Sequence, residues 1–338
     1  MLVGASRNRW INKRNFKNFL VPWLGNTLGI GPNIGGVFFV AGSGSAWEDN
    51  LLSYGVHSSE IATSLVAGED LLTAGQNDVL CVCPGTYTET AETNWDKRYT
   101  HMVGLGGPNI RGYDTYGTQF YTATATVARI VDLTGARCQF HNVSFANNGA
   151  GAAALSSFVV NAYGTRLKNC QFIGMMASTQ CDTAKANSLD IADNASYLDA
   201  ENCQIGTSEW ALQGADTNAP LYFSGVSGTM PSNGRFTNCK FATYQAATTR
   251  AMILTAGQNS VGRDWVFDQC EFYAFAVNHA TVMAEVLVNT GGVPSTHDIV
   301  FKNCTAINCT GFRTDSNGCT WTTGAASNEK GGVAVVAA

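Results

Sequence analysis

A six-residue pattern of apolar and polar positions recurs along the chain from residue 140 onward. Its first, fourth and sixth positions are apolar and its third is Asn or Gln, as at 140–145 and 167–172. Four more copies follow at 200–205, 236–241, 267–272 and 301–306, so that successive copies are 27 to 36 residues apart. A unit of this length indicates a solenoid of stacked repeats, with loops of varying length between them.

The third position of the pattern predicts a bend in the chain. In a straight strand the side chains alternate between two faces, so apolar residues would be spaced by two. Here the spacing is three and then two, which requires a turn at the amide residue. Asn tolerates a left-handed backbone better than most residues, and stacked repeats would align these amides into a hydrogen-bonded ladder. The expected ladder consists of Asn142, Asn169, Asn202, Asn238, Gln269 and Asn303.

A second apolar strand precedes each copy of the pattern and is followed by turn residues such as Gly, Ser and Asn. Each repeat is then a strand, a turn, a strand, the Asn bend, a strand and a loop. These additional strands are expected at 129–133, 157–160, 188–191, 220–223, 251–254 and 285–288. We therefore predict an all-β fold, a right-handed parallel β-helix of about eight rungs.

Charged residues beside the bend are expected to pair between neighbouring rungs, because opposite charges on adjacent strands attract each other. The expected pairs are Lys168 with Glu201, Asp268 with Lys302, and Lys240 with Glu271. We interpret these charges as structural rather than catalytic.

The two ends of the chain depart from the repeat. Residues 1–36 are a basic N-terminal arm with a Gly-rich linker, and 37–338 are the β-helix domain. Within this domain, 37–77 are expected to cap the rod through a helix from 58 to about 72, which has apolar residues on one side. A cap protects the exposed edge of the first rung. The apolar segment 333–338 is expected to form a last strand that caps the other end or contacts a partner chain.

Charged residues make up 13% of the 338 residues, about half of the usual ~25%. Ser, Thr, Asn, Gln and Gly must therefore cover much of the surface, which suits a rigid extracellular or particle-bound scaffold. No run approaches the ~18 apolar residues that a membrane-spanning helix needs. The segment 19–24 follows basic residues and faintly resembles a signal peptide, but it is short and contains Pro22.

The N-terminal arm is basic, although the chain as a whole has a net charge of −5. Five Lys and Arg residues, and no acid, precede Glu48. A basic arm on an acidic body suggests contact with something negative, with a solvated terminus as the alternative. We expect the arm to anchor the protein to a particle. The expected anchoring residues are Arg7, Arg9, Trp10, Lys13, Arg14, Phe16, Lys17, Phe19 and Trp23.

Most of the 11 Cys residues recur at one repeat position among apolar neighbours. This indicates small buried hydrophobic side chains rather than a disulfide framework. The chain has no CxxC pair and no Cys/His group with zinc-like spacing, so no metal site is predicted. The lone Gly104-x-Gly106 fragment does not support nucleotide binding, and no cofactor is expected.

Three features resemble the pectin-lyase-like superfamily of right-handed parallel β-helices. They are DVLCVCPGTYTE at 78–89, GLGGPNIRG at 104–112, and the repeated Asn-Cys rungs. The resemblance covers roughly residues 37–336. The superfamily includes polysaccharide lyases and hydrolases, phage tailspikes and other virion proteins, and adhesins, so the resemblance implies a fold and not an activity.

A catalytic cluster is not evident in the sequence. Glycoside hydrolysis needs two carboxylates that flank the bond, and a calcium-dependent lyase needs several carboxylates and a base. The neighbouring acids fall in turns or in charge-paired columns: Asp190 with Asp193, Asp199 with Glu201, and Asp264 with Asp268. The His residues are scattered and are expected to be solvated or hydrogen-bonded; they are His57, His101, His141, His279 and His297. We therefore expect no catalytic residues and no enzymatic activity.

Together, these features favour a structural virion protein of a tailed bacteriophage, made in the host cytoplasm. It would be a capsid decoration (cement) protein or the body of a head or tail spike. The expected partners are the major capsid protein or another virion protein, further copies of the chain in a homotrimer, and a host glycan, but no membrane and no specific nucleic acid. A polysaccharide-binding or polysaccharide-degrading tailspike is the alternative, and a bacterial surface adhesin is the third hypothesis. The sequence assigns no role to the long loops at 112–128, 174–187 and 206–219.

Overall fold

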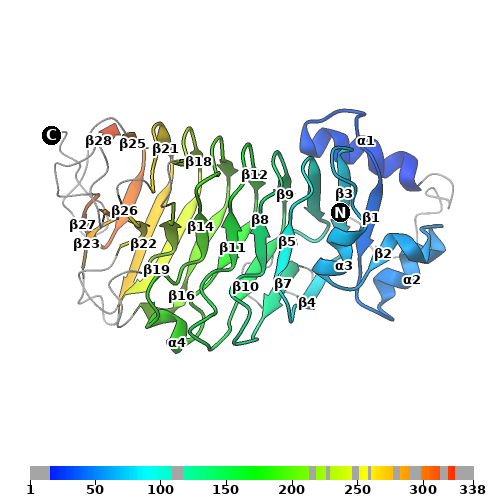
Figure 1. The fold of residues 1–338 in the computed structure, drawn as a ribbon, viewed down its shortest axis with the longest axis horizontal. Coiled ribbons are helices and arrows are strands. Elements are labelled where there is room, and N and C mark those ends of the chain that lie inside the picture. Colours follow the sequence, from blue (N-terminus) through cyan, green and yellow to red (C-terminus); the bar gives the residue numbers. More distant parts are fainter. Residues whose placement is uncertain are drawn as a thin grey trace.

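The chain forms a right-handed parallel β-helix, in agreement with the prediction (Figure 1). The computed structural model describes residues 16–108, 117–212, 218–225, 229–245, 251–257, 260–276, 282–289, 298–312 and 319–323. The strands stack into three long parallel sheets that run the length of the rod, named A, B and C below. Among the described residues, no helix is long and apolar enough to cross a membrane.

Each sheet is built from single strands of successive rungs, so strands far apart in the sequence lie side by side. Sheet A has the order β2 (Ile61–Ala62), β1 (Val37–Val40), β3 (Asp78–Val82), β6 (Thr100–Gly104), β9 (Gln139–His141), β12 (Arg166–Lys168), β15 (Asp199–Glu201), β18 (Arg235–Thr237), β21 (Trp265–Asp268), β25 (Asp298–Lys302) and β28 (Cys319–Thr323). Sheet B contains β4 (Gly85–Thr88), β7 (Thr118–Thr122), β10 (Ser144–Asn147), β13 (Gln171–Ile173), β16 (Gln204–Leu212), β19 (Lys240–Gln245), β22 (Glu271–Ala276) and β26 (Thr305–Ile307). Sheet C contains β5 (Thr93–Trp95), β8 (Val131–Leu133), β11 (Phe158–Val160), β14 (Leu189–Ile191), β17 (Leu221–Phe223), β20 (Ile253–Thr255) and β24 (Leu287–Asn289), while β23 (Met283–Glu285) pairs with β27 (Cys309–Gly311).

The bend between sheet A and sheet B is made by a left-handed residue in every repeat. All six amide positions of the pattern have φ between 52° and 57°. The side chain of Asn169 donates to the Oδ1 of Asn142 at 3.0 Å, and that of Asn238 donates to the Oδ1 of Asn202 at 2.6 Å. We call this row of residues the bend column.

The interior of the rod is apolar and rich in stacked aromatic rings. Residues at equivalent positions of successive rungs lie face to face, as for Phe145 and Phe172, whose ring centroids are 5.9 Å apart. The ten cysteines whose side chains the structure describes are free, and all but Cys304 are buried. The thiols at the position after the bend residue donate to carbonyls of the preceding rung, as Cys170 does to Phe140 at 3.2 Å. The other cysteines of this kind are Cys203, Cys239, Cys270 and Cys304. Repetition therefore creates both the core and its hydrogen bonds.

The N-terminal cap differs from the prediction. The single helix expected over 58–72 is instead a 3-10 turn (Ser58–Glu60), the short strand β2, and the helix α3 (Leu65–Asp70). Ile61 and Ala62 pair with β1, which interrupts the helix because their backbone groups complete the edge of sheet A. A new helix can then begin only at Ser64, whose hydroxyl accepts a hydrogen bond from the backbone of Ala67.

Two further helices in the N-terminal region were not predicted. These are α1 (Phe16–Leu28) and α2 (Ala46–Ser53), and a short α4 (Ser178–Cys181) occurs in a loop later in the chain. The apolar side of α1 packs against outward-facing residues of β3 and β6, such as Val79 and Val103. In Figure 1, α1 lies beside β3 and β1 at the N-terminal end of the rod. Residues 16–28 are thus a docked helix, within the segment expected to be arm and linker.

Two of the three expected charge pairs form between neighbouring rungs. The ammonium group of Lys168 is 2.8 Å from Glu201, and that of Lys302 is 3.4 Å from Asp268. Lys240 lies opposite Glu271 in the strand register, but its ammonium group is placed over the ring of Tyr273, 4.3 Å from the centroid. The C-terminal strand expected over 333–338 lies outside the described residues.

Candidate functional site

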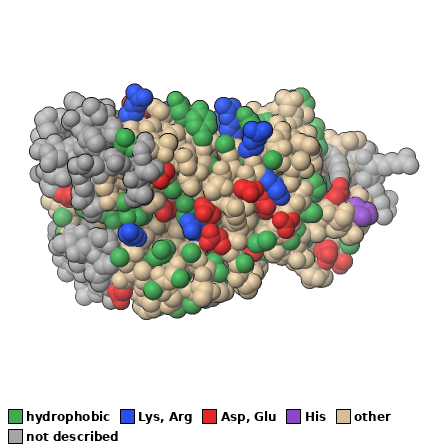
Figure 2. All heavy atoms as spheres, in the orientation of Figure 1, with side chains coloured by type: hydrophobic (Ala, Val, Ile, Leu, Met, Phe, Trp, Pro, Cys, Tyr) green, Lys and Arg blue, Asp and Glu red, His purple; other side chains and the backbone are tan. Residues whose placement is uncertain are grey.

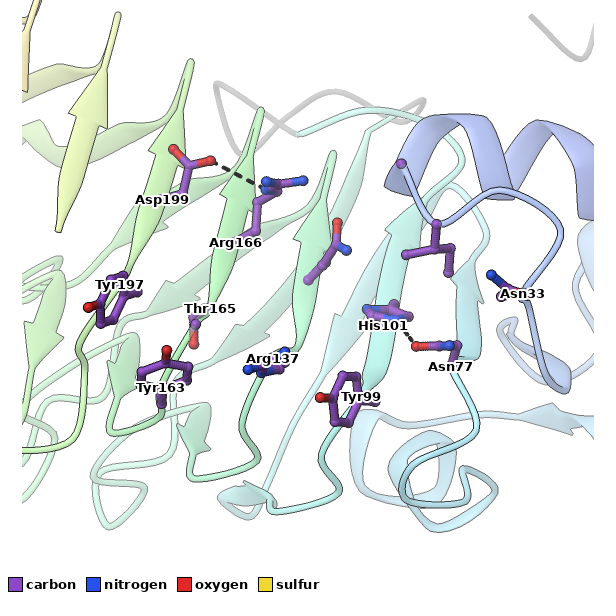
Figure 3. A pocket seen from close by; sticks show the side chains of 14 residues that line it. Asn33, Asn77, Tyr99, His101, Arg137, Tyr163, Thr165, Arg166, Tyr197 and Asp199 are labelled. Atoms are coloured by element: carbon purple, nitrogen blue, oxygen red, sulfur yellow. Dashed lines mark hydrogen bonds and ion pairs between the residues drawn. The ribbon is translucent and has the colours of Figure 1, made fainter. Parts of the chain in front are cut away.

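A groove of about 630 Å³ runs across several rungs on the outer face of sheet A (Figure 3). The loop after α1 closes one end through Gly29, Ile30 and Asn33. The floor consists of outward-facing residues of consecutive strands, namely His101, Gln139, Arg166 and Asp199. One side wall is formed by residues of the turns that enter sheet A: Asn77, Tyr99, Arg137, Tyr163, Gly164, Thr165 and Tyr197.

The turns that enter sheet A contain a second column of left-handed residues. Five residues before the bend residue, the backbone again has a positive φ in five consecutive repeats. These positions are Arg137 (61°), Gly164 (70°), Tyr197 (59°), Asn233 (58°) and Asp264 (61°), and Asn77 (59°) and Tyr99 (55°) precede β3 and β6 in the same way. We call this row the turn column. Its conformation directs Tyr99, Arg137 and Tyr197 to the groove.

Aromatic rings and one guanidinium group form a continuous row along this side of the groove. The guanidinium carbon of Arg137 lies 5.6 Å from the ring centroid of Tyr99 and 5.7 Å from that of Tyr163. The rings of Tyr163 and Tyr197 follow, with centroids 5.1 Å apart. These two rings are 43% and 54% exposed, so their faces and edges are available to a ligand.

Gly164 leaves room for this arrangement. A Cβ built at Gly164 would lie 3.2 Å from the Cγ of Arg137, and its φ of 70° disfavours any other residue. The backbone N–H of Arg137 donates to the carbonyl of Tyr163 at 2.8 Å. The turn at Tyr163 and Gly164 therefore fixes the position of the Arg137 side chain.

The floor of the groove is polar and nearly neutral. Arg166 forms an ion pair with Asp199, with Nε and Oδ2 3.3 Å apart, and His101 shares a hydrogen bond of 3.3 Å with Asn77. Burial, assisted by the nearby His141, lowers the pKa of His101 to about 4, so its imidazole is neutral at neutral pH. Arg137 thus supplies the excess positive charge of the groove.

A second cluster of ionisable groups lies on the outer face of sheet C. Figure 2 shows acidic side chains gathered along the middle of the viewed face, where Figure 1 places β8, β11 and β14. Asp132 and Asp190 occupy equivalent positions two rungs apart, with Val159 between them. Arg129 contacts Glu92 at 3.0 Å and Asp132 at 3.5 Å. Within the described part of the chain, the Oδ1 atoms of Asp132 and Asp190 are buried without a hydrogen-bond partner.

The environment of Asp190 favours the protonated carboxyl group. Burial raises its pKa to about 7, and the negative charge of Asp132 acts in the same direction, whereas Ser224 and Arg129 oppose the shift. Asp132, which is held by Arg129, lies two rungs away on the same face. No group of three His, Cys, Asp or Glu side chains among the described residues is placed to hold a metal ion.

The expected anchoring residues are divided by the structure. Arg7, Arg9, Trp10, Lys13 and Arg14 lie outside the described residues, and so does the side chain of Lys17. Phe16 is buried and stacks on Tyr54 with centroids 5.2 Å apart, so it attaches α1 to the rod and is not available to a partner. Phe19 and Trp23 are 61% and 39% exposed on the other side of α1.

The sequence prediction missed the groove residues because their types vary. No repeated motif contains Tyr99, Arg137, Tyr163 or Tyr197. The constant offset of five residues from the bend was the signal that could have found most of the turn column.

Comparison with protein-family models and with curated proteins finds no match. Among solved structures, carrot pectin methylesterase has a TM-score of 0.51 at 13% identity, over 85% of this chain and 77% of that one. A pectin methylesterase from Aspergillus niger has a TM-score of 0.47 at 12% identity, over 90% and 91% of the two chains. Geobacillus virus E2 ORF18 has a TM-score of 0.44 at 13% identity, over 77% of this chain and 54% of that one. At such identities the likeness concerns the fold alone: the chain shares the parallel β-helix fold of the pectin methylesterases.

Proposed function

We propose that this protein is a spike or decoration protein of a phage virion, and that the sheet A groove binds a surface polysaccharide. The observation that carries the binding role is the row of Tyr99, Arg137, Tyr163 and Tyr197 beside a polar floor. Aromatic rings take up the C–H faces of sugars, while amide, guanidinium and carboxylate groups bind the hydroxyls.

The geometry of the β-helix suits a polymeric ligand. Parallel strands are about 4.8 Å apart, so side chains at equivalent positions repeat at about the length of one sugar unit. The groove spans the four rungs of β6, β9, β12 and β15 and is open to solvent, so a chain can extend beyond it. Its residues are mounted on paired strands and fixed turns, which lowers the entropy lost on binding.

The binding role is tested with the double variant Tyr163→Ala/Tyr197→Ala on an array of purified bacterial capsular and O-antigen polysaccharides. We expect the native protein to bind a subset of them, and the double variant to bind these at least ~10-fold more weakly, because it loses two aromatic faces on which a ligand ring can stack. The corresponding contact of a nucleic-acid base with an aromatic side chain contributes about 1–3 kcal/mol. Tyr273→Ala is the matched control, because Tyr273 lies on sheet B. Equal binding by the double variant and the control would reject the groove as the binding site.

The virion role is supported by the basic N-terminal segment and by the exposed rings of Phe19 and Trp23 that follow it on α1. We propose that these groups attach the rod to the major capsid protein or another virion protein, and that the rod assembles as a homotrimer. Deletion of residues 1–15 combined with Phe19→Ala/Trp23→Ala leaves the buried side of α1 intact. Mass photometry with phage particles that lack the protein should show uptake of the native chain and none of the variant. Equal uptake of both would reject the anchor.

A depolymerase is the second candidate function, and Asp190 is the observation that favours it. A carboxyl group whose pKa is raised to about 7, two rungs from a second carboxyl group, resembles the pair of acids in a glycosidase. Two rung steps place the two residues roughly 9–10 Å apart, and inverting glycosidases hold their carboxyl groups about 6.5–9.5 Å apart. If this function is correct, the protein releases new reducing ends from a polysaccharide that it binds, and Asp190→Asn and Asp132→Asn each abolish the release. No release from any bound polysaccharide would leave the binding role alone.

A further inference from the structure

We infer that Arg137 makes the groove selective for a saccharide unit that carries a carboxylate; this inference rests on the polysaccharide-binding function proposed above. It concerns which ligands the groove prefers, whereas the tyrosine row concerns whether it binds sugars at all.

Arg137 differs from the other guanidinium group of the groove in having no acidic partner. Arg166 is neutralised by Asp199, with Nε and Oδ2 3.3 Å apart. No carboxylate of the described residues forms an ion pair with Arg137, and its guanidinium carbon lies instead over the rings of Tyr99 and Tyr163, at 5.6 and 5.7 Å from their centroids. An exposed guanidinium group that lines a groove and has no carboxylate partner can bind an anionic group of the ligand.

The two ring contacts also leave the N–H donors of the guanidinium group free. In Figure 3 Arg137 lies between Tyr99 and Tyr163, so the rings border its two sides. The N–H donors of a guanidinium group lie in its plane and form a rigid fork that matches the two oxygens of a carboxylate. The contacts with the two rings engage none of these donors with an oxygen acceptor, so the fork remains available to a carboxylate.

The side chain is positioned before any ligand binds. Its backbone is left-handed, its N–H is bonded to Tyr163, and the neighbouring Gly164 offers a surface without a side chain. The adjacent rings of Tyr163 and Tyr197 would then stack on the sugar whose carboxylate reaches Arg137. One geometry can satisfy both contacts, because the two rings and the guanidinium group belong to the same row.

The charge balance of the groove points the same way. The charged side chains among the lining residues are Arg137, Arg166 and Asp199, so one positive charge is in excess. A neutral glycan would leave this charge to water, whereas a carboxylated glycan would pair with it. Hydrogen bonds between charged partners contribute about 1.5–3 kcal/mol, which corresponds to an affinity difference of about 10- to 100-fold.

The test compares each polysaccharide that binds on the array with its carboxyl-reduced form, in which every carboxylate has become a primary alcohol. We expect the native protein to bind the reduced form at least ~10-fold more weakly. Arg137→Gln should bind both forms equally, at the level that the native protein shows for the reduced form. Arg137→Lys, which keeps the charge but not the fork, should fall between the two.

Arg235→Gln is the matched control, because Arg235 also projects from sheet A but is paired with Asp268 and lies outside the groove. It should retain the full discrimination. Circular dichroism and the unfolding midpoint verify that each variant is folded. Native protein that binds both forms equally, or discrimination that survives in Arg137→Gln, would overturn the inference while the binding function stands. Absence of binding to every polysaccharide would reject the proposed function and the inference with it.

Discussion

The bend column and the turn column border the two sides of sheet A, and both require a left-handed backbone in each repeat. In the bend column the residue is Asn in five of six repeats and Gln in the other. In the turn column it is Arg137, Gly164, Tyr197, Asn233 and Asp264 in five successive repeats. The backbone demand is the same, but the residues that meet it are not.

This difference separates structure from function along one sheet. The left-handed conformation costs about 1–2 kcal/mol for an ordinary L-residue and less for Asn. Asn in the bend column reduces this cost and adds amide hydrogen bonds between rungs. Tyr and Arg in the turn column do not reduce this conformational cost. They place large side chains in the groove. Residues held at a conformational cost are candidates for binding roles, which is the physical reason for locating the site there.

Removal of an amide from the bend column should have a large effect on stability. Asn169→Val should lower the free energy of unfolding by about 2–4 kcal/mol, because a β-branched residue strains the left-handed bend and the bond to Asn142 is lost. Asn169→Gly keeps the conformation and should cost about 1 kcal/mol. Denaturant unfolding followed by circular dichroism measures both. Equal losses for Val and Gly would mean that backbone strain is not what selects Asn.

The sequence predicted the bend column because the same residue type recurs in the same pattern. Asn142 and its equivalents are identical in chemistry, so spacing alone revealed both the bend and the fold. Arg137 and Tyr197 share a backbone conformation but no side-chain type, so no motif marked them. The groove also needs the loop after α1, and nothing in the periodicity of 16–28 indicated that this helix docks on sheet A. The sequence did not indicate that Asp132 and Asp190 share one face of sheet C, because only the register of β8, β11 and β14 aligns them.

A second test uses the histidines that lie between the two columns on sheet A. Burial, together with the charges of Lys168 and Arg166, lowers the pKa of His141 to about 4, whereas an unfolded His titrates near 6.5. Between these values the unfolded chain binds the proton and the folded chain does not, so stability falls as the pH decreases from about 6.5 to 4. One such group accounts for up to about 3 kcal/mol of this loss.

His141→Gln should flatten the fall in unfolding free energy below pH 6.5 relative to the native protein, as measured by denaturant titrations at a series of pH values. A native-like pH profile in His141→Gln would show that this side of sheet A does not exclude the charged imidazole.

One substitution in the turn column should change stability and binding in opposite directions. Tyr197→Asn places the residue type of the bend column in the turn column, where Asn233 already occupies the next rung with the same conformation. The free energy of unfolding should rise by about 0.5–1 kcal/mol as left-handed strain is relieved. Binding to the polysaccharides found on the array should weaken several-fold, because the ring that stacks beside Tyr163 is lost. Tyr197→Phe retains the ring and should change neither quantity. A variant that is both less stable and unchanged in binding would mean that Tyr197 serves the rod rather than the groove.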